Sequence, residues 1–380
     1  MNILFILVSA VPFGPNDVLA YKAAEELLRL GHRVLMSPWD WEEQNASEYD
    51  LIQKKGAVLA MRHGYRRSDN FFVRHLQKVH HRIKDPLTEW QFVDEFCPDA
   101  IVVNDMGTYH FLSVPGLMEL LTERDVPFFT ISHYNDENVY LTHSYKKARS
   151  LFAKARRCFF VSGRNLAVAR RQICYDFPQA LVIHNPPNLQ DWSYVPFPNS
   201  NRSRYCMVAR LVCAVKGQAL VLQVLSEPVW RDRDWSLSIF GKGPDEIYLR
   251  EFIEYVGLRD KVKMCGFTDD VRSVWLGQQI LVMASSGEGK PLALTEAMLC
   301  GRPAIVTDVG GNAELVSDGV TGFVAQSATV AGVRDALERS WVERSSWAAM
   351  GVRAHDWATR ALDPPPGNVV ASAIIDAILT

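Results

Sequence analysis

The feature that most constrains the fold of this sequence is the alternation of short apolar runs with amphipathic stretches along its whole length. This alternation is typical of βαβ units, in which helices connect parallel strands and cover both faces of the sheet. In the first half we expect strands at 2–8, 33–37, 57–60, 100–104, 127–132, 157–161 and 181–183. The connecting helices are expected at 17–30, 69–84, 114–123, 140–155 and 163–173.

A proline-rich segment, 186–198, interrupts this series, because proline can neither continue a helix nor lie in a central strand. A second series follows it, with strands expected at 204–209, 235–240, 261–265, 280–283 and 303–306 and helices at 217–226, 245–256, 290–300 and 329–340. A chain of 380 residues also exceeds the size at which one core keeps growing. We therefore predict an α/β protein of two Rossmann-like, doubly wound domains, 1–190 and 200–360, facing a central cleft. A last helix at about 366–380 is expected to cross back to the first domain.

Composition excludes several classes of protein. The net charge of −2 argues against a nucleic-acid-binding protein, and 48% hydrophobic with 22% charged residues is ordinary for a globular protein. Seven scattered cysteines without a Cys-x-x-Cys pair favour a reducing compartment and argue against structural zinc. The apolar start, 1–8, lacks a basic n-region and is interpreted as a buried first strand. We expect a cytoplasmic protein.

The segment 54–84 is locally basic, with nine Lys or Arg residues against one acid, Asp69. Three interpretations remain open: a solvated surface, peripheral contact with the inner face of a membrane or with a lipid-linked acceptor, and binding of an acidic acceptor. Tyr65, Phe71 and Phe72 slightly favour the second interpretation, although their helical spacing also suits a core face.

Two cations, Arg210 and Lys216, follow the strand expected at 204–209. A planar guanidinium that grips two oxygens and a compact ammonium together suit a diphosphate. A pair of solvated surface cations is the alternative.

Two acids, Glu288 and Glu296, lie where a glycine-containing loop runs into a helix. Gly287 and Gly289 let the backbone approach a ligand, and the helix start offers unpaired amides. Both glutamates can accept hydrogen bonds from sugar hydroxyls, with Glu296 expected about two turns inside the helix. A solvated helix start is the alternative.

Glycines open the turns after neighbouring strands as well. Gly241 and Gly243 follow the strand at 235–240, and Gly266 with Phe267 follows the next strand. Gly-x-Gly alone is weak evidence for a site. Residues suited to ligand binding follow four successive strands. They favour one shared site, because the carboxyl ends of parallel strands meet at the same edge of a sheet.

In their order along the chain, these motifs resemble those of glycosyltransferase family 4, retaining enzymes with the GT-B fold. The resemblance is strong over about 205–325 and holds only in outline in the first half. It implies that Arg210 and Lys216 bind the donor diphosphate, that Glu296 holds the ribose hydroxyls, and that Glu288 lies beside the transferred sugar.

The resemblance also implies roles for the backbone. Gly266 and Phe267 would meet the nucleotide base, and the backbone of Gly289, Lys290, Pro291 and Leu292 would meet the sugar hydroxyls and phosphate. Family members carry a Gly-Gly pair after the first strand, where this chain has only Gly14, with prolines at 12 and 15. Asn16 or Asp17 is expected to cap the next helix.

His133 ends a strand at the place where the family often has a histidine beside the donor sugar. A structural histidine is the alternative interpretation. His184, Asn185 and Pro186 resemble a family stretch that precedes the linker, where we expect only a hinge.

The predicted function is that of a retaining glycosyltransferase that moves a sugar from a nucleoside diphosphate to a hydroxyl of a glycan, lipid-linked or small-molecule acceptor. No cofactor and no metal are expected, since no Asp-x-Asp motif stands at a strand end and the family needs none. An inactive homologue that only binds nucleotide sugars is the alternative. A nicotinamide-dependent dehydrogenase ranks last, because the first strand lacks Gly-x-Gly-x-x-Gly after it.

Overall fold

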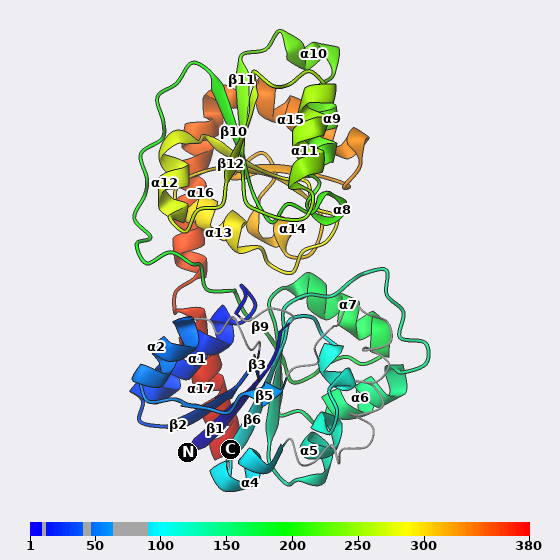
Figure 1. Ribbon diagram of the computed structural model, residues 1–380, viewed down its shortest axis with the longest axis vertical. Helices are drawn as coiled ribbons and strands as arrows, with labels where there is room; N and C mark the ends of the chain where they lie inside the picture. The colour runs from blue at the N-terminus through cyan, green and yellow to red at the C-terminus, as the bar shows by residue number, and fades with distance from the viewer. Residues whose placement is uncertain (10–12, 41–46, 64–89) are drawn as a thin grey trace. The chain divides into compact units, whose positions relative to one another are not determined.

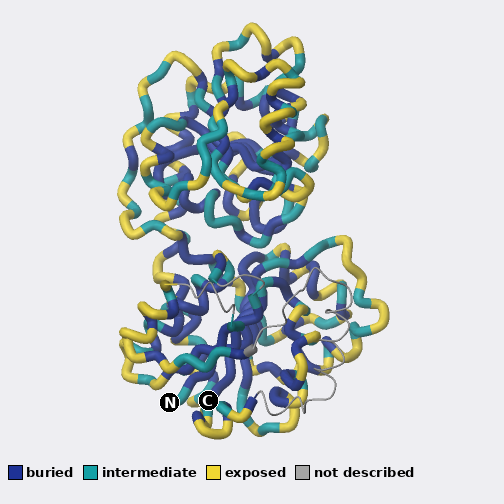
Figure 2. The backbone as a smooth tube through the Cα atoms, viewed as in Figure 1, coloured by how far each residue is buried: buried dark blue, intermediate teal, exposed yellow. Residues whose placement is uncertain are grey.

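The computed structural model describes residues 1–9, 13–40, 47–63 and 90–380. The chain divides into two compact units, each with its own parallel sheet covered by helices (Figure 1). Unit 1 comprises Met1–Pro186 with Pro364–Thr380, and unit 2 comprises Pro187–Asp363. In both units the strands are buried, and exposed residues gather on the outer helices and loops (Figure 2).

The sheet of unit 1 has the order β4-β2-β1-β6-β7-β8-β9, with every pair parallel. Its strands are β1 (Asn2–Val8), β2 (Arg33–Ser37), β4 (Val58–Leu59), β6 (Ala100–Asp105), β7 (Phe128–Ser132), β8 (Arg157–Phe160) and β9 (Ala180–Val182). A separate parallel pair is formed by β3 (Trp39–Asp40) and β5 (Arg62–His63). The central strand β1 is a continuous apolar run because helices cover both of its faces.

The described helices of unit 1 are α1 (Val18–Arg29), α2 (Ser47–Lys54), α4 (Gln91–Phe96), the 3₁₀ helix η2 (His110–Ser113), α5 (Leu117–Glu123), α6 (Tyr145–Lys154), α7 (Gly163–Ile173) and α17 (Pro366–Leu379). The last of these packs on α1. A Cβ at Gly367 would lie 2.6 Å from the Cβ of Lys22, so glycine is needed for this close approach.

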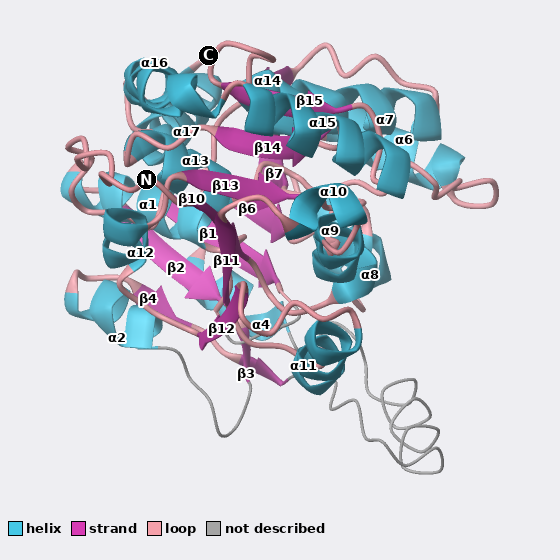
Figure 3. Ribbon diagram, turned by 90° about the horizontal axis from the view of Figure 1, so that it is seen from above, coloured by secondary structure: helices cyan, strands magenta, loops and turns pink. Residues whose placement is uncertain are grey.

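Unit 2 has a six-stranded parallel sheet in the order β12-β11-β10-β13-β14-β15 (Figure 3). Its strands are β10 (Ser203–Val208), β11 (Trp235–Phe240), β12 (Val262–Gly266), β13 (Ile280–Met283), β14 (Ala304–Thr307) and β15 (Gly322–Ala325). Its helices are α8 (Cys213–Lys216), α9 (Gln218–Leu225), α10 (Pro228–Arg231), α11 (Glu246–Tyr255), α12 (Val271–Gly277), α13 (Leu292–Leu299), α14 (Asn312–Leu315), α15 (Val330–Val342), η3 (Arg344–Ser346) and α16 (Trp347–Ala361).

The twelve strands predicted from the sequence are confirmed to within one residue at each end. Two helices, α5 and α6, begin three and five residues later than predicted. Gly116, with a φ of 70°, delays α5 to Leu117, and a turn that closes on the carbonyl of Leu141 precedes α6. The helix predicted at 69–84 lies outside the described residues. The sequence prediction omitted the strands β3, β5 and β15 and the α-helices α2, α4, α8, α10, α12, α14 and α16.

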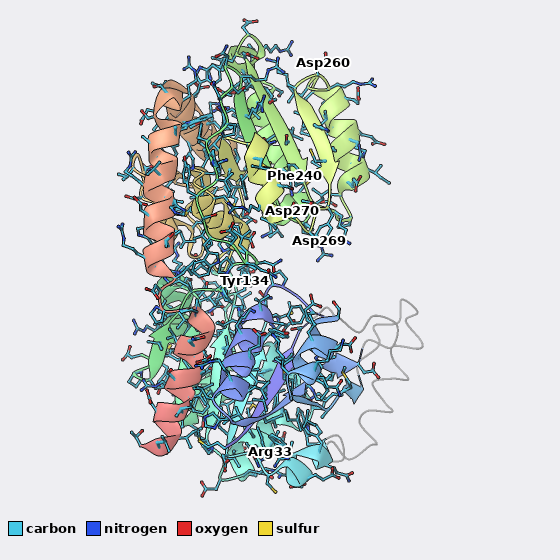
Figure 4. All side chains as sticks on the ribbon, turned by 90° about the vertical axis from the view of Figure 1, so that its left-hand side faces the viewer. Arg33, Tyr134, Phe240, Asp260, Asp269 and Asp270 are labelled. Atoms are coloured by element: carbon cyan, nitrogen blue, oxygen red, sulfur yellow. The ribbon has the colours of Figure 1, made fainter. Side chains whose placement is uncertain are left out.

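Because the strands of each sheet are parallel, their carboxyl ends meet at one edge (Figure 4). In unit 2, Phe240, Asp269 and Asp270 mark this edge, and Asp260 lies at the opposite one. This is the edge at which open α/β sheets bind ligands.

Candidate functional site

The loop 284–291 joins β13 to α13 at the carboxyl ends of the unit 2 strands and is held on two sides. On one side, Ser286 donates from its backbone amide to the carbonyl of Val215 at 2.9 Å and from its hydroxyl to the carbonyl of Ala214 at 3.0 Å. On the other side, the Thr307 hydroxyl donates to the carbonyl of Ser285 at 2.6 Å. The loop is therefore fixed between α8 and the end of β14.

Two glycines allow this close packing. A Cβ at Gly217 would lie 2.2 Å from the carbonyl oxygen of Ala284, and one at Gly310 would lie 2.0 Å from that of Glu288. Both residues also have positive φ, 68° and 51° respectively. Only glycine satisfies both requirements, so the backbone around Glu288 depends on these two positions.

The side chains of Lys216 and Glu288, predicted separately, form an ion pair. The Lys216 Nζ lies 2.6 Å from Glu288 Oε1, and the Ser285 hydroxyl donates to the same oxygen at 2.7 Å. The Glu288 side chain is 7% exposed and that of Lys216 is 23% exposed. An ammonium carries three donors, so Lys216 can hold Glu288 and still donate to an anionic ligand.

Arg210 follows β10 at the same edge and is exposed. Its carbonyl accepts a hydrogen bond of 2.9 Å from Gln218. Among the residues that the structure describes, no carboxylate forms an ion pair with its guanidinium. Arg210 therefore presents a bidentate donor group suited to phosphate oxygens.

Glu296 lies just over one turn inside α13, which begins at Leu292, and not two turns inside as predicted. Its carboxylate is 4% exposed and accepts a hydrogen bond of 2.9 Å from the backbone amide of Asn188. Burial raises the pKa of Glu296 to about 7, an effect that the Asn188 amide partly offsets. Asn188 was not among the site residues predicted from the sequence; the signal that could have found it is its place directly after the two prolines that open the linker.

Lys290 and Glu314 form a second pair beside the loop. The Lys290 side chain is 3% exposed, its Nζ lies 3.6 Å from Glu314 Oε2, and burial lowers its pKa. The carbonyl of Gly289 accepts from the Gly311 amide at 2.6 Å. Leu292 follows Pro291 as the first residue of α13, where the first amides of a helix have no partner within it.

The turns after β11 and β12 are joined by a backbone hydrogen bond. Gly241 donates its amide to the carbonyl of Gly266 at 2.8 Å, and Gly243 packs against Leu211, whose carbonyl oxygen would lie 2.4 Å from an added Cβ. Phe267 is 58% exposed, and the Lys242 Nζ lies 4.8 Å from the centroid of its ring. The exposed aromatic face is available for stacking.

In unit 1, His133 follows β7 and is buried. Its Nε2 lies 2.8 Å from Asn104 Oδ1, and the Asn104 amide nitrogen donates to Asp17 at 3.1 Å. Burial lowers the pKa of His133 to about 4, so the ring is neutral at pH 7. Because Asn104 presents its oxygen, the neutral ring donates from Nε2.

Asp17 organises the loop that follows β1. Its carboxylate accepts from the Ser9 hydroxyl at 2.5 Å and from the Gly14 amide at 2.9 Å, as well as from Asn104. The side chain does not cap α1, contrary to the prediction for Asn16 or Asp17. Burial raises the pKa of Asp17 to about 6, and the three donors offset part of this effect. The amide of Gly14, the one glycine that stands in place of the Gly-Gly pair, is therefore bound to a carboxylate.

The described residues contain no cluster of three or more His, Cys, Asp or Glu side chains able to hold a metal ion. Of the basic segment 54–84, residues 64–84 lie outside the described residues. No described helix has the length and apolarity required to cross a bilayer.

Comparison with solved structures identifies the architecture. HepE of Anabaena, solved in complex with UDP, superposes with a TM-score of 0.71 at 17% identity, covering 100% of this chain and 99% of that one. A glycosyltransferase of Rickettsia africae gives a TM-score of 0.76 at 15% identity, with the same coverage. The fold is that of the GT-B glycosyltransferases.

Residues 202–341, most of unit 2, match the family model of group 1 glycosyl transferases. The α-D-kanosaminyltransferase of Streptomyces kanamyceticus is 32% identical over 130 residues, which are 34% of this chain and 34% of that protein. The N-acetyl-α-D-glucosaminyl L-malate synthase of Bacillus anthracis is 29% identical over 123 residues, 32% of each chain. The matched regions thus span about a third of these relatives.

A longer match extends into unit 1. The lipopolysaccharide 1,6-galactosyltransferase of Escherichia coli is 24% identical over 271 residues, which are 69% of this chain and 68% of that protein. Unit 2 is the part of the chain that matches the family model of group 1 glycosyl transferases, and the similarity to this relative continues beyond it.

Proposed function

We propose that the protein is a retaining glycosyltransferase of family 4 that transfers a sugar from a nucleoside diphosphate to an acceptor hydroxyl without a metal ion. One observation carries the proposal: Lys216 and Glu288 form an ion pair of 2.6 Å within the region that matches the group 1 glycosyl transferases. Arg210 and Glu296 belong to the same edge of the sheet.

Lys216 and Arg210 stabilise the departing diphosphate in this mechanism. When the bond between the anomeric carbon and the phosphate oxygen breaks, the diphosphate gains negative charge, and two fixed cations at its oxygens lower the energy of that state. The Glu288 carboxylate beside Lys216 then faces the sugar, where it accepts hydrogen bonds from hydroxyls and favours positive charge on the ring.

Glu296 holds the ribose in this proposal. Its carboxylate is buried and its pKa is raised to about 7, so hydroxyl groups that donate to it favour its ionised form. Phe267 offers an exposed ring to the base, and Gly266 precedes it without a neighbouring atom within 4 Å of an added Cβ.

The configuration at the anomeric carbon is retained if the acceptor approaches that carbon from the same face of the sugar ring that the diphosphate leaves. The acceptor oxygen bonds to the anomeric carbon of a short-lived oxocarbenium ion, and its proton passes to the leaving diphosphate. Unit 1 supplies the acceptor side, with a neutral His133 as a hydrogen-bonding group for the sugar. Relatives named for lipopolysaccharide and for phosphatidylinositol mannoside substrates support a glycan or lipid-linked acceptor.

The test incubates the full chain with UDP-, GDP- and ADP-sugars and a panel of glycan and lipid-linked acceptors, with and without a chelator. We expect one donor to give a product whose anomeric configuration, read by NMR, equals that of the donor. The double variant Arg210→Ala with Lys216→Ala should abolish transfer while the circular dichroism spectrum is unchanged. An inverted product, or full turnover by the double variant, would refute the mechanism. Calorimetric binding of a donor without any product would identify an inactive nucleotide-sugar-binding homologue.

A further inference from the structure

Charge is strongly segregated within unit 1. Residues 90–137 contain one Arg, Arg124, and nine acids: Asp94, Glu95, Asp99, Asp105, Glu119, Glu123, Asp125, Asp136 and Glu137. Residues 138–175 contain no acid and nine cations: Lys146, Lys147, Arg149, Lys154, Arg156, Arg157, Arg164, Arg170 and Arg171. A stretch of this length with charge of only one sign predicts a partner of the opposite sign.

The cations of this stretch lie on α6, on α7 and at the start of β8. The two helices pack against each other and lie side by side in unit 1 (Figure 1, Figure 3). On α6, Ala148, Leu151 and Phe152 face the core, which turns Lys146 and Lys147 toward solvent. The same pattern on α7 leaves Arg170 and Arg171 exposed.

Of these cations, one forms an ion pair within the unit and four exposed ones do not, among the residues that the structure describes. Arg164 pairs with Glu137 at 2.8 Å. In the part of the chain that the structure describes, no carboxylate forms an ion pair with Lys146, Lys147, Lys154 or Arg171. Mutual repulsion among them favours binding of a surface that carries many negative charges.

Apolar side chains stand exposed beside the cations. In the turn before α6, Tyr140 is 79% exposed and Val139 is 43% exposed. The turn is fixed to α7, because the Gln172 side-chain amide donates to the carbonyls of Asp136 at 2.7 Å and Val139 at 2.8 Å. The backbone that carries these apolar groups is therefore held in place while their side chains face solvent.

We name the exposed sides of α6 and α7, together with the turn 139–144, the basic face. We infer that the basic face docks the protein on a bilayer of anionic phospholipids. The cations match lipid phosphates, and an aromatic and an aliphatic side chain at their margin match the boundary between headgroups and acyl chains. An acidic polysaccharide or a nucleic acid could take the cations and stack on Tyr140, but neither matches the exposed aliphatic side chain of Val139, whereas the boundary between headgroups and acyl chains matches both.

The inference is independent of the transfer reaction, because it concerns where the protein binds and not what it catalyses. It also differs from membrane contact through segment 54–84, since the two sets of cations can be changed separately.

The test measures co-sedimentation of the full chain with vesicles of phosphatidylcholine alone or of phosphatidylcholine with phosphatidylglycerol. We expect binding only to the anionic vesicles, with weaker binding at high salt because exposed charges are screened. The variant Lys146→Ala, Lys147→Ala, Arg171→Ala should bind on the order of 100-fold more weakly, at about fivefold for each cation removed. When the salt concentration is raised, Tyr140→Ala should lose a larger share of its binding than the wild type does, because it lacks part of the apolar contribution, which salt does not screen.

The matched control is Arg231→Ala, Lys263→Ala, Arg360→Ala, which removes three exposed cations of unit 2 and the same net charge. It should bind as the wild type does. Equal binding by the basic-face variant and the control would overturn the inference, and would assign any membrane binding to another segment. Failure of the wild type to bind anionic vesicles while it binds heparin would also overturn it, in favour of an acidic polysaccharide.

Discussion

Replacing Glu296 by glutamine should stabilise the protein at neutral and alkaline pH while it weakens donor binding. Burial raises the pKa of Glu296 from the usual 4.5 to about 7. The folded state therefore holds this proton more tightly than the unfolded state, and stability is lost as the pH rises between these two values. Glutamine cannot ionise, but its carbonyl can still accept the 2.9 Å hydrogen bond from Asn188.

The size of the stability difference between Glu296→Gln and the wild type follows from the shift in the pKa of Glu296. Each unit corresponds to about 1.4 kcal/mol, so the full cost of ionising Glu296 in the folded protein is about 3 kcal/mol. Integrated between about pH 5 and about pH 8, the difference in unfolding free energy between Glu296→Gln and wild type should grow by about 2.5 kcal/mol in favour of the variant.

Urea unfolding followed by tryptophan fluorescence measures this difference. Seven of the ten tryptophans, at positions 192, 230, 235, 275, 341, 347 and 357, belong to unit 2, so the signal follows the unit that contains Glu296. Glu343→Gln, at an exposed position of the same unit, is the matched control and should show the same difference at both pH values. If Glu296→Gln also gives the same difference at both, the carboxylate does not carry the raised pKa and the reasoning fails.

Two further variants test what holds the site. Gly310→Ala should raise the donor KM by on the order of 100-fold, because a Cβ 2.0 Å from the Glu288 carbonyl oxygen must displace the loop. The control Gly319→Ala has a φ of 72° but open space around it, and it should leave KM unchanged in the same steady-state assay. Equal KM values in the two variants would show that the loop position is irrelevant to donor binding. Arg302→Met should lower the unfolding free energy of unit 2 by about 3 to 5 kcal/mol in urea titrations, because it leaves buried carbonyls without their donor. The buried guanidinium donates to the carbonyls of Gln278, Val195, Cys300, Gly301, Pro196 and Trp275. A loss below about 1 kcal/mol would contradict this structural role.

The strands were predictable because each is a short, continuous apolar run between turn residues, as β1 and β13 show. The helix α16 was not, because its buried positions are mostly small residues, with Gly351, Ala354 and Ala358 in place of a leucine stripe. The four-residue strand β15 is too short for its pattern to stand out.

For the site, the sequence order of strand ends correctly grouped Lys216 and Glu288 at one edge of the sheet. Their contact could not be predicted, since it depends on how Gly217, Gly310 and Thr307 fix a loop 72 positions away from Lys216. The hydrogen bonds that join Asp17, Asn104 and His133 were also beyond the sequence, because three separate strand ends bring these residues together.

Calorimetric titration of UDP, GDP and ADP tests the central claim, that Arg210 belongs to a binding site for a nucleoside diphosphate. We expect at least one of the three to bind the wild type and to bind Arg210→Ala about 10- to 100-fold more weakly, the effect of losing a charge-assisted hydrogen bond. Arg202→Ala, at the opposite end of β10 and paired with Asp234 at 2.7 Å, should bind as the wild type does. Wild-type affinity in Arg210→Ala, or no binding of any of the three nucleotides, would contradict the account.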